Sequence, residues 1–287
     1  MEKTTKKRTQ FGEVWRRFRK SKSSMLGLFI IVAVLLISAC SGLLFDYDTE
    51  VIATVGPRLA KPCAEFPFGT DEMGRSIFNR VVYGARYSIS VGFVAVLVSL
   101  VVGVPMGAIA AYAGGKVENA IMRFNDIFLS LPSIFIAIAI VSAFGKSTLT
   151  LMVAVGVSSI CTFCQVTRAA VLTVRNNEYI EAARAIGMTD WQILFAHILP
   201  NCLAPIIVQT TFRMGSAIIS AASLSFLGLG VPMPAPEWGS MLSAGRKYLL
   251  GYSYMTLFPG LALLLTVIAF NLMGDGLRDA LDPKLKH

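Results

Sequence analysis

The chain has 287 residues, of which 55% are hydrophobic and only 15% are charged, whereas a soluble domain carries about a quarter charged residues. Its formal net charge is +9, and most of the excess lies in residues 1–25, which hold nine basic and two acidic side chains. This composition argues against a soluble enzyme, a disordered chain or a basic nucleic-acid-binding domain. It predicts an integral membrane protein with a basic cytoplasmic N-terminal end.

Six apolar segments are long enough to cross a hydrocarbon core about 30 Å thick, which takes roughly 17–25 helical residues. They are residues 25–45, 88–112, 127–144, 148–166, 203–229 and 257–273. The first is longer than the roughly 7–15 apolar residues of a signal peptide and no clear cleavage site closes it, so we interpret it as a membrane anchor. The sequence therefore predicts an all-α membrane protein with six transmembrane helices, divided into a basic cytoplasmic segment, 1–24, and one transmembrane domain, 25–287.

The basic residues orient these helices, because cytoplasmic loops carry the excess of Lys and Arg. With residues 1–24 inside, six crossings return the C-terminal end to the cytoplasm, and the connection between the fourth and fifth segments is cytoplasmic as well. The outside loop 46–87 holds six acids and five bases, so it has no positive excess. Both termini are predicted to be cytoplasmic.

Prolines in or beside the apolar segments predict irregular backbone. Pro105 and Pro132 lie in the second and third segments and are expected to bend those helices, since each removes a backbone donor. Residues 231–236 contain three prolines and cannot form a regular helix. We expect an outside loop there, with Trp238 anchoring it at the level of the lipid headgroups.

The most informative polar segment is the cytoplasmic connection 176–201. Asn177 is suited to cap a short helix, whose first turn places Glu178 and Glu181 near its positive N-terminal end. Gly187 suits the left-handed residue that ends such a helix.

A second helix is predicted to begin directly afterwards. Thr189 and Gln192 form a capping-box pattern, and the helix is expected to run towards His197 and to end at Pro200. Two short helices that meet at a glycine allow two interpretations. The segment is either an amphipathic connector at the membrane interface or a docking surface for a soluble partner, with the two alanines of the first helix leaving a smooth patch.

This segment resembles the EAA loop of permease subunits in ABC importers. That motif consists of Glu-Ala-Ala, a Gly four residues later, and a Leu-Pro pair twelve and thirteen residues after the Gly. The sequence matches each position and has a histidine where an apolar residue is usual. The corresponding residues are Glu181, Ala182, Ala183, Gly187, His197, Leu199 and Pro200.

Further segments between about residues 15 and 283 are similar to the dipeptide, oligopeptide and nickel branch of that family. They include FGTDEMGR at 68–75, Gly-Gly at 114–115, SLSFLGLG at 223–230, PEWG at 236–239 and NLMGDGLRDALDP at 271–283. The sequence departs from the family pattern at positions where Asp, Asp, Arg and Glu are usual, namely Ser76, Glu118, Gln165 and Ala221.

The resemblance implies the type I ABC importer permease fold and the role of the shorter, C-type subunit in a bacterial cytoplasmic membrane. Such a subunit works with a second permease subunit, two ATP-binding subunits that hold ATP and Mg, and an extracytoplasmic substrate-binding protein. This chain itself would be no enzyme and would hold no cofactor or metal. Its EAA loop would couple the ATPases to translocation of di- or oligopeptides, or of a related substrate such as a nickel chelate or glutathione.

Arg213 is the most unusual single residue, because it lies ten residues into the fifth segment, about 15 Å along a helix and near the middle of the membrane. A charge there is costly and commonly faces a bundle interior or a water-filled cavity. Three interpretations stay open. Arg213 lines the substrate pathway and attracts a peptide carboxylate, or it pairs with an acid of another subunit, or the helix begins later and leaves Arg213 at the membrane interface.

Other polar groups favour structural or solvated roles. Cys161 and Cys164 have CxxC spacing, but no His lies in the same segment, so buried packing is expected. The tail acids are expected to be solvated or to face an ATPase: Asp275, Asp279 and Asp282. The charges of the outside loop are expected to be solvated or to touch a binding protein: Glu65, Asp71, Glu72, Arg75, Arg80 and Arg86.

The main rival function is an ion-gradient-driven secondary transporter for small solutes. Segments two to six contain no Asp or Glu, which argues against coupling to protons or sodium through intramembrane acids. A membrane-embedded enzyme would need a convergent set of catalytic side chains, and the sequence shows no such set.

Overall fold

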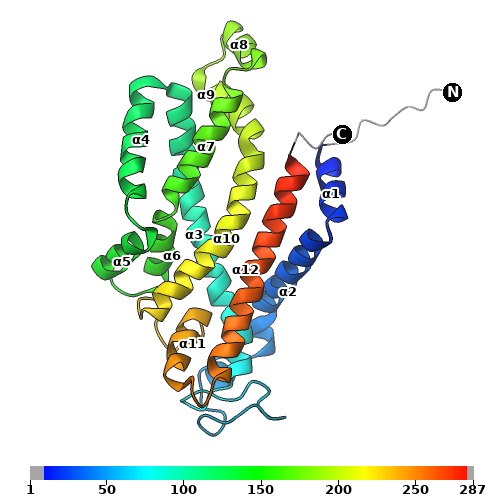
Figure 1. The fold of residues 1–287 in the computed structure, drawn as a ribbon, viewed down its shortest axis with the longest axis vertical. Coiled ribbons are helices and arrows are strands. Elements are labelled where there is room, and N and C mark those ends of the chain that lie inside the picture. Colours follow the sequence, from blue (N-terminus) through cyan, green and yellow to red (C-terminus); the bar gives the residue numbers. More distant parts are fainter. Residues whose placement is uncertain (1–9, 283–287) are drawn as a thin grey trace, which may run out of the picture.

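The computed structural model describes residues 10–282, and this part of the chain is built from helices (Figure 1). Five helices are long and apolar enough to cross a membrane: α2 (Lys22–Leu44), α3 (Ile77–Ala113), the pair α6 and α7 (Thr148–Val157 and Ile160–Val174), the continuous segment Asp190–Phe226 that ends in α10 (Leu203–Phe226), and α12 (Tyr254–Leu281). These correspond to five of the six predicted segments.

The third predicted segment is a bent pair of helices rather than one straight span. α4 (Gly115–Leu129) and α5 (Ser133–Phe144) meet at an angle of 85°. Pro132 lies at the break, where its ring disfavours helical backbone at the preceding residue. The prediction of six spans therefore holds with this pair counted as one, while the predicted bounds 127–144 were wrong. Pro105, in contrast, lies inside α3, which continues past it.

The bundle is centred on α3, which packs against α7, α6, α10 and α2. At Gly103 an added Cβ would lie 2.6 Å from the carbonyl oxygen of Ile160, and at Gly107 it would meet the carbonyl oxygen of Cys164. The two helices therefore approach backbone to backbone, which only small residues permit. α12 lies between α2 and α10 on the other side of the bundle (Figure 1).

Large apolar side chains stay exposed around the outside of the bundle. Examples from four helices are Phe29, Leu36, Val101, Phe135 and Leu264. Such a surface is unfavourable in water and is matched by a hydrocarbon environment, in which the helices satisfy their own backbone hydrogen bonds. The fold is that of a multi-pass membrane protein.

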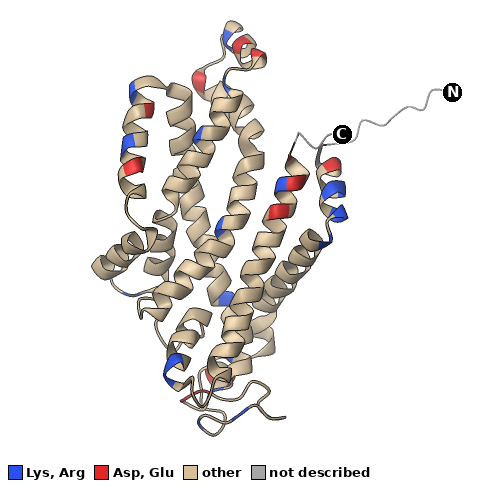
Figure 2. Cartoon of the chain, in the orientation of Figure 1, with Lys and Arg blue, Asp and Glu red and all other residues tan. Residues whose placement is uncertain are grey.

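The charged residues are concentrated at the two ends of the bundle (Figure 2). α1 (Gln10–Lys20), α8 (Glu178–Ala185) and the C-terminal end of α12 lie at one end, which is the cytoplasmic end by its basic residues. At the other end lie loop 46–76, with a short π-helix η1 (Tyr47–Val51), and then α11 (Trp238–Gly245) and the 3₁₀ turn η4 (Arg246–Tyr248).

Trp238 does not anchor a loop at the headgroups, as the sequence had suggested. Its side chain is only 2% exposed, and its indole Nε1–H donates to the carbonyl oxygen of Val81, 2.9 Å away. The residue opens α11 and locks it against α3. The three prolines before Trp238 predicted a surface loop. Burial is favourable here because the apolar ring leaves water while the indole N–H keeps a backbone acceptor.

Candidate functional site

The segment 176–201 forms the cytoplasmic tip of the molecule (Figure 1). α8 begins after Asn177, which has the extended backbone of a cap although its side chain makes no capping hydrogen bond. Glu181 and Ala182 are exposed, whereas Ala183 is only 5% exposed. The predicted smooth patch therefore consists of Ala182 alone, since Ala183 faces the protein's own core.

Gly187 ends α8 in the left-handed conformation that the sequence predicted, with φ of +83°. The N–H of Met188 donates to the carbonyl oxygen of Ala183, 3.2 Å away, and the N–H of Gly187 to that of Arg184, 3.0 Å away. These two bonds are those of a Schellman motif, which fixes the direction of the chain after a helix. No heavy atom lies within 4 Å of where a Cβ at Gly187 would stand, so only the backbone conformation restricts this position.

The predicted capping box is confirmed at α9 (Asp190–Gln192). The Thr189 hydroxyl accepts from the N–H of Gln192, and the Gln192 side chain accepts from the N–H of Thr189. The helical path does not end at Pro200, however, where the sequence predicted its end. It passes through a π turn, η2 (Ile193–Ile198), and a 3₁₀ turn, η3 (Leu199–Cys202), into α10. Pro200 takes an early position of the 3₁₀ turn, where its missing N–H is tolerated.

The tip is anchored by apolar side chains that point back into the bundle. Ile180, Ile193 and Ile198 are fully buried and pack with residues of α3 and α7, among them Ala108 and Val171. Burying a side chain of this size contributes about 1.5–3 kcal/mol. The tip is thus part of a packed core and not a loose connector.

Tyr112, at the cytoplasmic end of α3, holds the two short helices together. Its hydroxyl donates to Asp190 Oδ1, 2.6 Å away, and the Arg184 guanidinium lies 5.6 Å from its ring centroid. Arg175 donates through Nη1 to the carbonyl oxygen of Ala111 on the same helix end. The sequence analysis missed Tyr112, because 78 residues separate it from Asp190 and no local pattern links them.

A second connection joins α4 to α7 near the same end. Arg168 Nε donates to Glu118 Oε1 at 2.7 Å, and Nη2 of the same guanidinium lies 2.5 Å from that oxygen in an ion pair. Both side chains are partly buried, so this pair is screened less than a surface ion pair. Glu118 is one of the positions where the sequence departs from the family pattern, and it keeps the negative charge that Arg168 requires.

The tip exposes large apolar side chains beside charged ones such as Glu181. We name these apolar side chains the tip patch: Tyr179, Ile186, Trp191 and Phe195. Ile186 is 79% exposed, beside Gly187. His197 and Leu199 are half-buried, and Pro200 is exposed. Exposed aromatic and aliphatic groups on a rigid support are typical of a protein contact surface.

Arg213 lies in the middle of α10, half-buried, and its Nη2 donates to Thr162 Oγ1 of α7, 2.7 Å away. Within residues 10–282, no acidic side chain forms an ion pair with it. In this structure the charge therefore lies against a neutral partner on the neighbouring helix. Cys161 and Cys164, in the adjoining part of α7, are buried free thiols, which confirms the packing expectation.

The charges of the outside loop divide into two groups. Glu65 and Arg86 are solvent-accessible, but Asp71, Arg75 and Arg80 are each more than nine-tenths buried. The expectation that these three are solvated or touch a binding protein was wrong. They form an internal ion-pair network at the extracytoplasmic end.

Two families match the chain. One, described as binding-protein-dependent transport system inner membrane component, matches residues 103–287, and one described as the N-terminal TM domain of oligopeptide transport permease C matches residues 9–62. The dipeptide transport system permease protein DppC of Alkalihalophilus pseudofirmus is 46% identical over 276 residues, 96% of this chain and 90% of that protein. The glutathione transport system permease protein GsiD of Pectobacterium atrosepticum is 42% identical over 280 residues, 97% of this chain and 93% of that protein.

Among solved structures, the fold is similar to a chain of the MetNI methionine ABC transporter in an inward-facing conformation. The TM-score is 0.60 at 19% sequence identity, and the match covers 71% of this chain and 97% of that chain. A second crystal form of the same transporter gives a TM-score of 0.59 at 20% identity. At this level of identity the likeness concerns the fold.

Proposed function

Because this chain belongs to the family of binding-protein-dependent transport system inner membrane components and is an ABC importer permease, we propose that it forms one half of a translocation pathway for short peptides. Relatives that it matches over nearly their whole length are named for dipeptide, di/tripeptide and glutathione transport. The substrates in these names share one chemistry: each is a small molecule with peptide bonds, at least one carboxylate and an ammonium group. That class is the proposed substrate.

The proposed complex contains a second permease subunit, two ATP-binding subunits and an extracytoplasmic substrate-binding protein. ATP and Mg would be bound by the ATPase subunits, and this chain would catalyse no reaction itself. Its sequence contains Gly145-Lys146-Ser147, but the position five residues before that glycine is Ile140, so the full phosphate-binding pattern is missing.

The observation that carries the coupling role is the rigid mounting of the tip patch. Glu181, Ala182 and the tip patch face outward, while Ile180 and Ile193 bury the tip against α3 and α7. A push on the patch would therefore move these helices instead of deforming a loop, since packed interiors transmit displacement. We assign Glu181, Ala182 and Gly187 to ATPase docking, and Ala183 and Leu199 to the support beneath.

Arg213 is proposed to line the pathway and to attract the carboxylate of a passing peptide. Its only side-chain hydrogen bond within the described residues goes to a neutral hydroxyl, so its charge is not cancelled in this chain. Arg213→Ala is expected to lower the uptake rate about tenfold, corresponding to a loss of about 1.4 kcal/mol, with the assembled complex intact. Uptake into proteoliposomes measures the rate, and size-exclusion chromatography measures whether the complex is assembled.

Thr162→Val provides the matched control, because it removes the hydrogen bond and keeps the charge. Arg213→Lys keeps the charge and should preserve more than half of the uptake. If Arg213→Ala transports normally, or if it fails to assemble while Arg213→Lys assembles, the residue is structural and the pathway role is wrong.

The function as a whole is tested by purification with the proteins encoded beside it. We expect two ATPase subunits to co-purify, and we expect the reconstituted complex to take up radiolabelled trialanine when ATP is supplied to the ATPases and no ion gradient is imposed. Uptake that requires an imposed ion gradient, proceeds without ATP and is abolished by an ionophore would instead establish the rival secondary transporter.

A further inference from the structure

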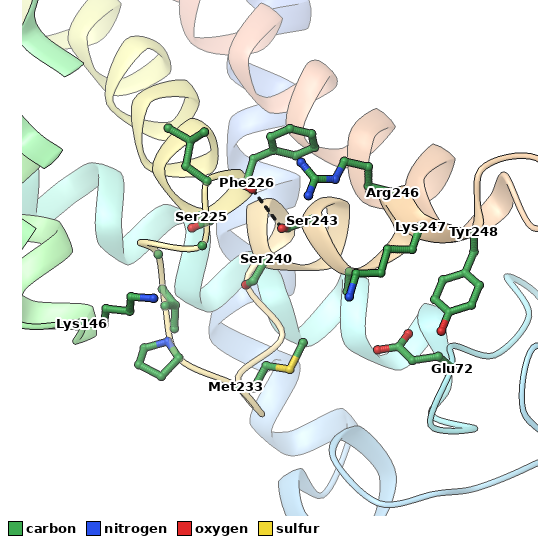
Figure 3. A pocket seen from close by; sticks show the side chains of 16 residues that line it. Glu72, Lys146, Ser225, Phe226, Met233, Ser240, Ser243, Arg246, Lys247 and Tyr248 are labelled. Atoms are coloured by element: carbon green, nitrogen blue, oxygen red, sulfur yellow. Dashed lines mark hydrogen bonds between the residues drawn. The ribbon is translucent and has the colours of Figure 1, made fainter. Parts of the chain in front are cut away.

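A cavity of about 480 Å³ opens at the extracytoplasmic end of the molecule. Its walls come from the loop after α5, the end of α10 with the loop that follows, and η4 (Figure 3). Small-molecule sites are concave and of this size, roughly 300–1,000 Å³, whereas protein partners need broad surfaces. The cavity therefore has the dimensions of a site for a small solute.

Three cations from two distant parts of the chain meet at this cavity. Lys146 comes from the loop between α5 and α6, and Arg246 and Lys247 come from η4, one hundred residues later. Figure 3 shows Lys146 and Lys247 on opposite sides of the loop that carries Met233, and both residues line the cavity. Arg246 lies over the Phe226 ring at 4.7 Å, and none of the three forms an ion pair within residues 10–282.

Glu72 adds one negative charge to the same wall. Its Oε2 is buried and has no hydrogen-bond partner among the described residues, and Arg75 Nη2 is 3.9 Å from Oε1. Arg75 is held by Asp71, with Nε 2.6 Å from Oδ2, so it does not approach Glu72 more closely. The Glu72 side chain as a whole is 22% exposed and lines the cavity, so its negative charge attracts an ammonium group that enters there.

Ser225 contributes a second unpartnered group to the wall. It is 3% exposed, and its Oγ makes no hydrogen bond within residues 10–282. The neighbouring Ser243, in contrast, donates to the carbonyl oxygen of Phe226, 3.1 Å away. The Ser225 hydroxyl is buried against Gly230 and is not open to a ligand. The cavity thus combines three cations that form no ion pair within residues 10–282 with one acid, which suits a ligand with charges of both signs.

We propose that this cavity is an entry site that binds peptides by their charged ends before they reach the membrane-embedded pathway. Carboxylates bind Lys146, Lys247 and Arg246, and the ammonium group binds Glu72. Three cations against one acid favour ligands with more carboxylates than ammonium groups. The inference rests on the proposed import of short peptides and adds a selectivity for acidic ones that this chain itself provides.

Three ligands distinguish recognition of the carboxylate from recognition of the ammonium group. Glutathione carries two carboxylates and one ammonium group, trialanine carries one of each, and trialanine amide carries only the ammonium group. Binding to the complete permease–ATPase complex in nanodiscs, without the binding protein, is measured by saturation-transfer NMR. The wild-type complex should bind glutathione most tightly, trialanine next and the amide least.

The decisive variant is the double substitution Lys146→Gln and Lys247→Gln. Its Kd for glutathione should rise about fivefold, while its Kd for trialanine amide should stay the same, because two exposed charge pairs contribute about that factor together. Glu72→Gln should weaken binding of the amide instead. Lys61→Gln makes the same charge change on an exposed residue of the same end, outside the cavity, and should change nothing.

Two outcomes would overturn the entry site. Equal affinity of wild-type and double variant for glutathione excludes recognition of carboxylates. A loss of binding-protein association in the double variant, with unchanged peptide binding, would make the cavity part of a protein docking surface. Both outcomes are compatible with normal ATP-dependent uptake of trialanine, whereas failure of that uptake in the wild-type complex would remove the proposed function itself.

Discussion

Asp71→Ala is expected to destabilise the protein strongly. Asp71 Oδ2 accepts from Arg75 Nε at 2.6 Å and lies 3.7 Å from Arg80 Nε, while Oδ1 accepts from the N–H groups of Met73 and Arg75. Both arginines are 3–4% exposed. Removing the acid leaves two buried cations near one weakly placed carboxylate, and breaking a buried pair in this way costs about 3–5 kcal/mol.

The measurement is the thermal unfolding of the purified protein in detergent, followed by tryptophan fluorescence. The melting temperature should fall by about 10 °C, or the variant should fail to accumulate in the membrane. Glu65→Ala removes an exposed acid of the same loop and should leave the melting temperature unchanged. A further Arg75→Met in the Asp71→Ala background should recover part of the loss, since it removes one of the uncompensated charges. Wild-type melting of Asp71→Ala would refute the network.

Glu181→Lys and Gly187→Trp are each expected to abolish most ATP-dependent uptake. Glu181 is exposed on α8, and reversing its charge acts on the docking surface, where a central contact is worth about 2 kcal/mol or more. At Gly187 a Trp must either keep φ near +83°, which costs about 1–2 kcal/mol, or adopt another backbone conformation, which redirects the chain between the two short helices. A loss of coupling of this size lowers uptake about tenfold or more.

Two matched controls separate docking from local structure. Glu178→Lys makes the same charge change in the first turn of α8 without altering the motif, and Gly115→Trp puts the same residue at another open cytoplasmic glycine, with φ of +53°. Both should keep more than half of the uptake. Uptake into proteoliposomes is compared with the amount of ATPase that co-purifies. Full uptake by both motif variants, with ATPase bound, would show that 176–201 is only an interfacial connector.

The correct sequence predictions share one property, which is that the deciding interactions are local. Apolar runs identify the spans because a helix must satisfy its own backbone bonds in lipid. Gly187 and the Thr189–Gln192 capping box involve residues at most a few positions apart, so their spacing predicts the end of one helix and the start of the next. Even the bent third span was signalled, because Pro132 acts on the residue beside it.

The sequence alone thus determined the membrane class, the orientation, the order of the spans and the two short helices of segment 176–201. Only the tertiary structure decided which side chains are buried and which distant residues they contact. It buried Asp71 with Arg80 and Trp238 against Val81, turned Ala183 inward, and joined Tyr112 to Asp190. The physical reason is that a charge or an aromatic ring has the same local pattern whether it is solvated or buried, and its partner lies wherever the packing of distant helices places it.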